Sequence, residues 1–547
     1  MFWKLVNNKR NDESGSLQDI PVESFVESFK SNYVDSGDNE IAVTEFFSVF
    51  NNSEQTDRLV FQIDEVNSAV SKLSNSSVLD CNNLQSYHLK YAHPAVYMAL
   101  KLLFNKIVES GVVPNNFGVS VITPVVKNPS ASLHDVSNYR PVAIGSVIAK
   151  SFESLIELRF GQLFRYHNNQ FGFSTGGGCS KAIFAFNNTV KYFRNRNSNV
   201  YIATLDMTKA FDRVNQYSVL QCMLAKGFPL QLVNVMLCWL RNMKGCIKWD
   251  NCISECFNIR SGCAQGSILG PKLFNLVIDK LLENLEQSQL GCRVCTCYAG
   301  TFAYADDIIL LSSSVKHMQS MLNLCSQFGI TCDLSFNVKK SMWGVVGTLV
   351  GNPILQLGTC ELPKVESIIV YLGVCFKLNA KLSVDYSQRC RKFLASVCCV
   401  LRNKVVGFED VFAHVLVRKC LPILNYGLDC VLLDYNSINV ISKSWNTAFR
   451  WLFNLGKFES TRLLFQSHST MSMKYLLDMK LLCFVFSCIS GSSSGMLMKT
   501  LSQTLIHGDL NKLLKKYHLT IYHNIKDVKR AVHADFDMYC NDLVPDV

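Results

Sequence analysis

The chain has 547 residues, of which 48% are hydrophobic and 18% are charged, and its formal net charge is +11. The length excludes a peptide or a single small module, and the hydrophobic content excludes a disordered chain. No secretory leader precedes the 23 cysteines, so we expect a reducing intracellular compartment rather than a disulfide scaffold. The most apolar stretch, Leu481–Ile489, is too short to cross a bilayer, and we expect no membrane partner.

The positive charge is concentrated outside the first 60 residues, which are net acidic. The rest of the chain is therefore more basic than the total charge indicates. A basic body attracts polyanions through its summed field, which favours nucleic acid as a partner, although many ordinary proteins of this size are comparably basic.

The N-terminal part of the chain is expected to be helical. Residues 1–16 are polar and charged with few apolar side chains, which is typical of a flexible end. Farther along, Phe25, Phe29 and Tyr33 recur at i, i+4 and i+8, the spacing of one helix face. We therefore predict a helical N-terminal extension over residues 17–117.

The central part alternates short strands with helices. β-branched residues dominate Val119–Val126 and predict a strand, and a second strand-like segment, Pro141–Ile144, follows a loop. A helical pattern returns over Ser146–Arg165. The segment Val200–Leu205 is apolar on both faces, as expected for a buried strand, and it ends at Asp206.

Two short apolar runs, Thr301–Ala305 and Ile308–Ser312, flank the pair Asp306 and Asp307. This pattern predicts a hairpin with the acid pair at its bend.

Further strands are expected at Gly344–Val350 and Ile368–Phe376, and long amphipathic helices dominate after about residue 380. Trp445, Phe449 and Phe453 form a stripe at helical spacing, which indicates packing in a core rather than a cofactor site.

Three acids lie among apolar residues in the sequence, which is not typical of carboxylates at a protein surface. Asp306 and Asp307 have only apolar residues, Tyr and Ala around them, and Asp206 closes an apolar strand. Buried carboxylates need a partner, and a divalent cation at a strand end is one. Together these carboxylates would hold two Mg²⁺ ions for phosphoryl transfer. The alternative is an exposed turn whose acids face water, and the Tyr-Ala-Asp-Asp motif alone leaves both readings open.

The segments around the acids resemble, in order and spacing, the reverse transcriptases of non-LTR (LINE-like) retrotransposons. They match finger motifs, the palm motifs and the motifs that follow the palm. In chain order the matches are ITPVVKNPS at 122–130, NYRPVAI at 138–144, QFGFSTGGG at 170–178, LDMTKAFDRVN at 205–215, SGCAQGSILGPKLFNLVID at 261–279, AYADD at 303–307, SFNVKKS at 335–341 and VYLGV at 370–374.

The resemblance implies a role for each acid. Asp206 and Asp306 would ligate two Mg²⁺ ions, for which Mn²⁺ is a possible substitute, with the Met207 carbonyl as a further oxygen ligand. Asp307 would support the site as a less direct ligand.

The resemblance also implies contacts with the nucleotide. Lys127 and Arg140 match basic finger residues that embrace the triphosphate. Phe211 matches a bulky ring that lies against the sugar and clashes with a 2′-hydroxyl, and packing beside Phe193 is its alternative.

Gln265 and Gly266 match a turn that approaches the nucleotide and the template backbone. Lys340 matches a lysine that assists the departure of pyrophosphate as an acid. Solvated surface charge stays an alternative for the three basic residues.

The C-x-x-C-x-C pattern of Cys292, Cys295 and Cys297 has no second pair of ligands after it, so we expect no zinc site.

The resemblance implies an α+β fold of the right-hand polymerase type, with fingers, an antiparallel-sheet palm, a helical thumb, and helical N- and C-terminal extensions. We expect fingers and palm over residues 118–379, a helical thumb and post-polymerase region over 380–500, and a basic helical tail over 501–547.

The implied function is RNA-directed DNA synthesis by two-metal nucleotidyl transfer. Its partners would be an RNA template, a DNA primer or target, and dNTPs, and integration would require access to the nucleus. Only about 60 residues precede the similarity, so we expect this chain to lack the endonuclease that related elements carry. Two alternatives stay open: a decayed, retroelement-derived nucleic-acid-binding protein, and a reverse transcriptase that binds RNA as an intron maturase does.

Overall fold

The computed structural model divides into two compact units, here called unit 1 and unit 2. Unit 1 holds residues 1–167, 207–281 and 325–336, and unit 2 holds residues 168–206, 282–324 and 337–547. The expected flexible end at residues 1–16 lies outside the described residues. The structure describes residues 20–33, 58–76, 78–129, 131–250, 252–263, 266–349, 351–491, 495–508, 510–520 and 523–541.

Unit 1 contains a sheet with the strand order β2-β1-β4-β5, in which β6 also pairs with β4. The predicted strand at Val119–Val126 is confirmed as β1, and it pairs with β2 in an antiparallel hairpin. The strands are β1 (Val119–Val126), β2 (Tyr139–Gly145), β4 (Lys244–Trp249), β5 (Cys252–Ile253) and β6 (Phe257–Asn258).

Helices cover this sheet through an aromatic core. Phe152 contacts the rings of Phe61, Phe104, Phe117 and Trp239, with centroids 5.0 to 6.1 Å apart. The helices are α2 (Val22–Lys30), α4 (Ile63–Ser71), α5 (Ser86–Lys90), α6 (Pro94–Ser110), α7 (Val147–Phe160), α9 (Ala210–Arg213), α10 (Gln216–Ala225) and α11 (Leu230–Arg241). Two further helices, α12 (Gly270–Gln287) and α13 (Val315–Thr331), have residues in both units.

The N-terminal helix α2 packs because its aromatic face is buried, as the spacing predicted. Phe25 and Phe29 are almost completely buried. The Phe25 ring lies 5.1 Å from Tyr139 of β2 and 4.7 Å from Trp249 of β4. These contacts fix α2 against the sheet.

Unit 2 contains an antiparallel sheet with the order β11-β3-β10-β9. The predicted buried strand is β3 (Val200–Leu205), and it lies between β10 (Asp307–Ser312) and β11 (Met342–Val346). Strand β9 (Thr301–Tyr304) completes the hairpin that the two apolar runs predicted. Apolar side chains on both faces of β3 are buried, so the sheet is covered on both sides.

The strand structure predicted at Ile368–Phe376 is confirmed, but a turn that the sequence did not predict divides it. The structure has two strands there, β14 (Ile368–Tyr371) and β15 (Val374–Leu378), with β16 (Leu382–Val384) beside β15. Leu372 and Gly373 make the turn with φ angles of 46° and 73°. Two residues with positive φ form a tight hairpin turn. Apolar residues lie on both sides of this turn, so the sequence has the pattern of one continuous strand.

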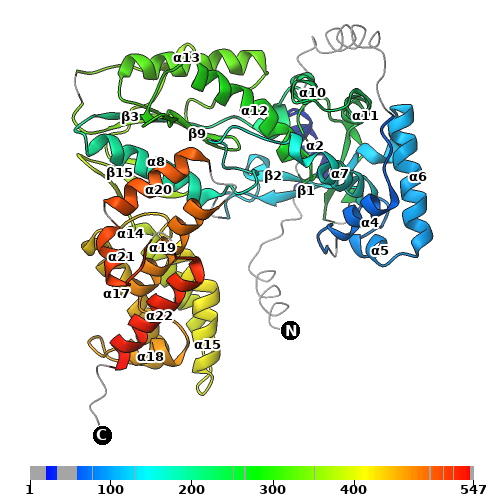
Figure 1. Cartoon of the computed structure of the whole chain (residues 1–547). Coiled ribbons are helices and arrows are strands. Elements are labelled where there is room, and N and C mark those ends of the chain that lie inside the picture. Colours follow the sequence, from blue (N-terminus) through cyan, green and yellow to red (C-terminus); the bar gives the residue numbers. More distant parts are fainter. Residues whose placement is uncertain are drawn as a thin grey trace. The chain divides into compact units, whose positions relative to one another are not determined.

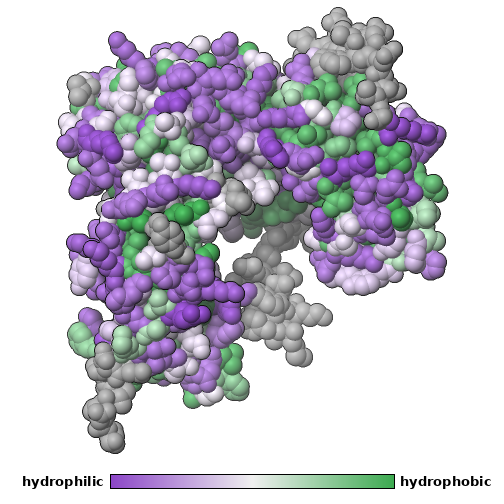
Figure 2. Space-filling view, in the orientation of Figure 1, coloured by the Kyte–Doolittle hydropathy of each residue, from purple (hydrophilic) through white to green (hydrophobic). Residues whose placement is uncertain are grey.

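The C-terminal part of unit 2 is a cluster of helices (Figure 1) that shares one hydrophobic core with the sheets of this unit. Trp445 and Phe449 are completely buried, which confirms the predicted core stripe. The visible face of α22 is mainly hydrophilic (Figure 2), as expected for an amphipathic helix. The helices are α14 (Ser387–Leu401), α15 (Glu409–Val415), α16 (Leu421–Asn425), α17 (Tyr435–Phe453), α18 (Arg462–Ser467), α19 (Met473–Ser490), α20 (Met496–His507), α21 (Asn511–Lys516) and α22 (Ile525–Asn541).

Further elements of unit 2 are one helix and two short hairpins. Helix α8 (Cys179–Arg194) packs against the sheet, and two short hairpins are formed by β7 (Arg293–Val294) with β8 (Cys297–Tyr298) and by β12 (Gln356–Leu357) with β13 (Cys360–Glu361). Across the described residues, no helix combines the length and the hydropathy that a bilayer crossing needs.

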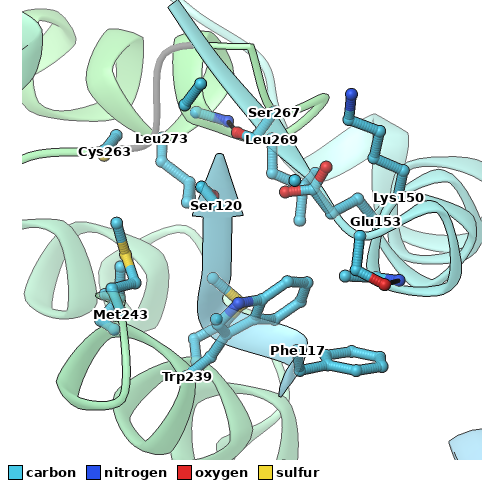
Figure 3. Close-up of a pocket in the computed structure, with 18 residues that line it drawn as sticks. Phe117, Ser120, Lys150, Glu153, Trp239, Met243, Cys263, Ser267, Leu269 and Leu273 are labelled. Carbon is cyan, nitrogen blue, oxygen red and sulfur yellow. Dashed lines mark hydrogen bonds between the residues drawn. The ribbon is translucent and has the colours of Figure 1, made fainter. Parts of the chain in front are cut away.

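One buried carboxylate in unit 1 makes stability depend on pH. Glu153 of α7 is only 6% exposed, and it lines a pocket with Lys150 and Cys263 (Figure 3). Burial raises the pKa of Glu153 from 4.5 to about 7, although a hydrogen bond from the Ile268 backbone opposes this change. The fold therefore favours the neutral carboxyl, and this stabilisation is lost as the pH rises through about 7.

The variant Glu153→Gln should remove this loss of stability. Relative to wild type, its free energy of unfolding should increase between pH 5 and pH 8 by up to about 3 kcal/mol, because glutamine stays neutral. Hydrogen exchange of α7 amides, with both proteins compared at the same pH, measures the difference. A difference that does not change between pH 5 and pH 8 would contradict the raised pKa.

Candidate active site

The acid pair lies on the β9–β10 hairpin of unit 2. Tyr304 pairs with Asp307, and Ala305 and Asp306 form the turn between the strands. Ala305 has a φ of 56°, a left-handed conformation that few residues other than glycine adopt. Asp306 therefore lies at the tip of a tight turn, and Asp307 is the first residue of β10.

Asp206 comes next to this pair because of the register between β3 and β10. Leu205 pairs with Ile308 in an antiparallel ladder. Continuing the same register by one position places Asp206 opposite Asp307. The structure thus places the backbones of the three acids that the sequence singled out side by side.

The backbone of Asp206 is held by the segment 337–341. Its N–H donates to Ser341 Oγ at 3.0 Å, and its carbonyl accepts from the Asn337 N–H at 2.8 Å. Ser341 is completely buried. Lys340 Nζ lies 3.7 Å from Asp206 Oδ2, so the predicted lysine is at the acids.

Met207, the predicted carbonyl ligand, is a buried residue of unit 1 that forms an isolated bridge with Phe336. The flanking residues make the bonds of this bridge: Asn337 donates to the Asp206 carbonyl, and Thr208 donates to the Ser335 carbonyl. This pairing does not use the Met207 carbonyl.

The turn of the acid pair is clamped by a second segment. Gln170 Oε1 accepts from the Ala305 N–H and from the Gly172 N–H, both at 3.0 Å. A Cβ on Gly172 would lie 2.4 Å from the Ala305 nitrogen, so only glycine allows this approach. Gln170 and Gly172 therefore fix the position of the left-handed residue.

The three acids repel one another. The pKa of Asp307 is raised from 3.8 to about 6, first because the surrounding protein removes it from water and then because of the charges of Asp306 and Asp206. Its side chain nevertheless keeps contact with solvent. A cation at this end of the sheet would relieve the repulsion.

The donor set suits a hard divalent ion, since carboxylate and carbonyl oxygens are the ligands that Mg²⁺ prefers. The side chains are not converged: among the described residues, no group of three His, Cys, Asp or Glu is arranged to hold a metal ion. Like charges separate unless a cation draws them together, and Asp206 is here paired with Lys340.

Unit 1 places the predicted triphosphate ligands on one surface. Val125 pairs with Arg140, and the Lys127 N–H donates to the Asn138 carbonyl, so the ladder continues past the end of β1. Side chains two positions apart on a strand share a face, so Lys127 and Arg140 lie on the same face of the β1–β2 hairpin. Both are exposed, and Lys127 Nζ donates to the Ser137 carbonyl at 2.8 Å.

Phe211 and Gly266 also belong to unit 1, and Gln265 lies outside the described residues. The Phe211 ring packs on Phe274 of α12, with centroids 4.4 Å apart, and stays partly exposed. Gly266 has a φ of 107°, and a Cβ there would lie 2.3 Å from the Ala143 carbonyl oxygen. Only glycine lets this turn approach β2 so closely.

The sequence that carries these motifs finds a match among known proteins. The sequence model of the family described as reverse transcriptase (RNA-dependent DNA polymerase) matches residues 126–381. This match covers slightly less than half of the chain. The predicted α+β class is confirmed, and the sheet β11-β3-β10-β9 lies within the matched residues.

Relatives extend the comparison. The Retrovirus-related Pol polyprotein from type-2 retrotransposable element R2DM of Drosophila melanogaster is 25% identical over 295 residues, which are 52% of this chain and 28% of that protein. The Retrovirus-related Pol polyprotein from type-1 retrotransposable element R2 of Nasonia vitripennis is 29% identical over 224 residues, which are 41% of this chain and 22% of that protein. The chain thus spans about a quarter of the length of these relatives.

Among solved structures, apo telomerase from Candida Tropicalis aligns with 83% of this chain and 76% of that chain, at 13% identity and a TM-score of 0.40. The relatives confirm the resemblance to retrotransposon reverse transcriptases that the motifs predicted.

Two residues of this site were missed by the sequence reasoning. Gln170 and Ser341 stand inside quoted motifs, but nothing in the motifs assigned them a contact. Their roles depend on partners 135 residues away in the chain.

The variant Ser341→Ala should loosen Asp206, because the N–H of Asp206 loses its acceptor beside a buried strand. We expect a loss of about 1–3 kcal/mol in stability, measured by hydrogen exchange of β3 amides. The control Ser383→Ala, at an exposed position, should change stability by less than about 0.5 kcal/mol. Equal effects of the two substitutions would show that the Ser341 bond does not hold Asp206.

Proposed function

We propose that this chain is an RNA-directed DNA polymerase that copies an RNA template into DNA, as part of a non-LTR retrotransposon. The observation that carries the proposal is the meeting of Asp206, Asp306 and Asp307 at one end of the sheet β11-β3-β10-β9, with the pKa of Asp307 raised by its neighbours. An acid with a perturbed pKa that lies beside other acids at a strand end is typical of a catalytic site.

The acids and the Met207 carbonyl would hold two Mg²⁺ ions, or Mn²⁺ in their place. These ions would supply the charge that activates the primer 3′-hydroxyl and stabilises the departing pyrophosphate. Ser341 and Gln170 would keep the backbones of Asp206 and Ala305 in place during the reaction. Lys340, at 3.7 Å from Asp206, would donate a proton to the leaving group.

The nucleotide would be bound by groups of unit 1. Lys127 and Arg140, which share one face of the hairpin, would pair with the triphosphate. The Phe211 ring, backed by Phe274, would collide with a 2′-hydroxyl and so select dNTPs. Gln265 and Gly266 would lie against the nucleotide and the template.

The other partners would be an RNA template and a DNA primer or target, chosen by base pairing rather than by protein contacts to bases. Binding through phosphates should weaken as the salt concentration rises. Integration into chromosomal DNA would place the protein in the nucleus, and cytoplasmic assembly before import is compatible with this.

Primer extension on an RNA template, with dNTPs and Mg²⁺, tests the proposal. Wild type should extend the primer, and Asp306→Ala should reduce the rate at least about 1,000-fold, because the site loses a metal ligand. The control Glu366→Ala removes a carboxylate whose side chain is 86% exposed and should leave the rate unchanged. If wild type and Asp306→Ala bind template equally and neither extends, the chain is a nucleic-acid-binding relic instead.

The variant Phe211→Ala should admit ribonucleotides. Removing the ring should lower the ratio of kcat/KM for dNTP to that for rNTP by about tenfold or more, mainly through a gain with rNTP. Single-nucleotide incorporation with dNTP and rNTP measures the ratio, and Phe211→Tyr, which keeps the ring, is the control. A Phe211→Ala variant that loses activity with both substrates equally would assign Phe211 to core packing.

A further inference from the structure

A buried carboxylate lies behind the residues assigned to the nucleotide. Glu153 lines a cavity of about 50 Å³ in unit 1, a volume that suits water molecules and is far too small for a nucleotide. In Figure 3, Glu153 and Lys150 come from the same helix, and Cys263 lies across the cavity. The cavity is therefore of interest for what Glu153 contacts rather than for a ligand.

Glu153 binds the segment that follows Gly266. Its Oε2 accepts from the Ile268 N–H at 2.8 Å, and the Leu269 N–H and the Ser267 side chain also hydrogen-bond to its carboxyl group. Ser267 Oγ in turn accepts from the Gly270 N–H at 2.7 Å, where α12 begins. One carboxyl group thus holds the start of α12 at a helix end that favours negative charge.

The residues on both sides of this segment contact Phe211 and β2, where the nucleotide is proposed to bind. On the N-terminal side, the Cys263 N–H donates to the Phe211 carbonyl at 2.8 Å. On the C-terminal side, Gly266 lies against Ala143 of β2, and Phe274 of α12 packs on the Phe211 ring. A shift at the start of α12 would therefore move both the ring and the close turn.

We propose that Glu153 is a positioning residue for nucleotide binding: its ionised carboxylate fixes the segment 266–270 and, through it, Phe211 and Gly266. The inference rests on the proposed polymerase function. The ionised form accepts hydrogen bonds from N–H groups more strongly than the neutral form. Nucleotide binding should therefore strengthen as Glu153 loses its proton.

The pH range follows from the surroundings of Glu153. Its pKa of about 7 reflects burial, and the charge of Lys150 on the same helix opposes this effect. Cys263 is the ionisable group that faces it from the loop, and burial raises the pKa of this thiol to about 12, so Cys263 stays neutral. The walls from β1 and α11, which include Ser120, Trp239 and Leu240, carry no charge.

The test compares wild type with Glu153→Gln in primer extension at pH 6, 7 and 8. At pH 6 the wild-type carboxyl is mostly neutral, so the ratio of dNTP KM values, variant to wild type, should be about 1. At pH 8 the ratio should be about 5, with kcat within about twofold. A ratio that is the same at all three pH values overturns the inference.

A matched control is Glu157→Gln, on the same helix. Glu157 makes a partly exposed ion pair of 3.1 Å with Lys272 of α12, and we expect this pair to contribute little to stability. Its KM ratio should stay near 1 at every pH, and a rise equal to that of Glu153→Gln would assign the effect to helix charge in general.

A second readout does not depend on polymerisation. Hydrogen exchange over residues 266–274 should be faster in Glu153→Gln than in wild type at pH 8 and equal at pH 6. At pH 8 the variant should thus be more stable in α7 yet looser at this segment, a pair of opposite changes that a purely structural role would not produce. If wild type fails to extend primers but exchange changes as stated, the polymerase proposal fails and the contact role stands. If wild type extends and exchange is unchanged, the inference fails.

Discussion

The register between β3 and β10 is the constraint on which the candidate site depends. Because Leu205 pairs with Ile308, the next position of each strand carries an acid, and the turn adds a third. A slip of one residue would turn Asp206 to the other face of the sheet. The apolar side chains of β3, buried on both faces, and the bond from Asp206 to the buried Ser341 oppose such a slip. The packing of β3 therefore also determines where the acids lie.

Several strands could be predicted from the sequence because each is marked by a short run of β-branched or apolar residues. The β-branched run at Val119–Val126 and the apolar run at Val200–Leu205 predicted strands with the observed bounds. The turn at Leu372 and Gly373 was missed, because apolar residues flank it and no polar turn residue interrupts them. The role of the three acids as metal ligands was predicted from the order of the motifs and not from the periodicity of the sequence.

Contacts between distant parts of the chain could not be predicted in this way. Gln170 reaches Ala305 and Glu153 reaches Ile268, across 135 and 115 residues. In one sequence, a glutamine after an asparagine or a glutamate in an amphipathic helix has the pattern of a surface residue. Only the folded chain shows that each accepts backbone N–H groups in a buried place. The same holds for Lys127 and Arg140, whose shared face follows from the hairpin register rather than from their spacing.

Glu153 and Asp307 both have raised pKa values, but the causes lead to different behaviour. Both groups favour the fold when neutral, so each opposes folding as the pH rises through its own pKa, about 7 for Glu153 and about 6 for Asp307. For Asp307 part of the cause is repulsion from other acids, which a bound cation would cancel. For Glu153 the cause is burial, which the hydrogen bonds from the backbone and the charge of Lys150 oppose. Metal binding should therefore weaken the pH dependence of stability near pH 6 and leave that near pH 7 unchanged, so one titration with and without metal separates the two carboxyl groups.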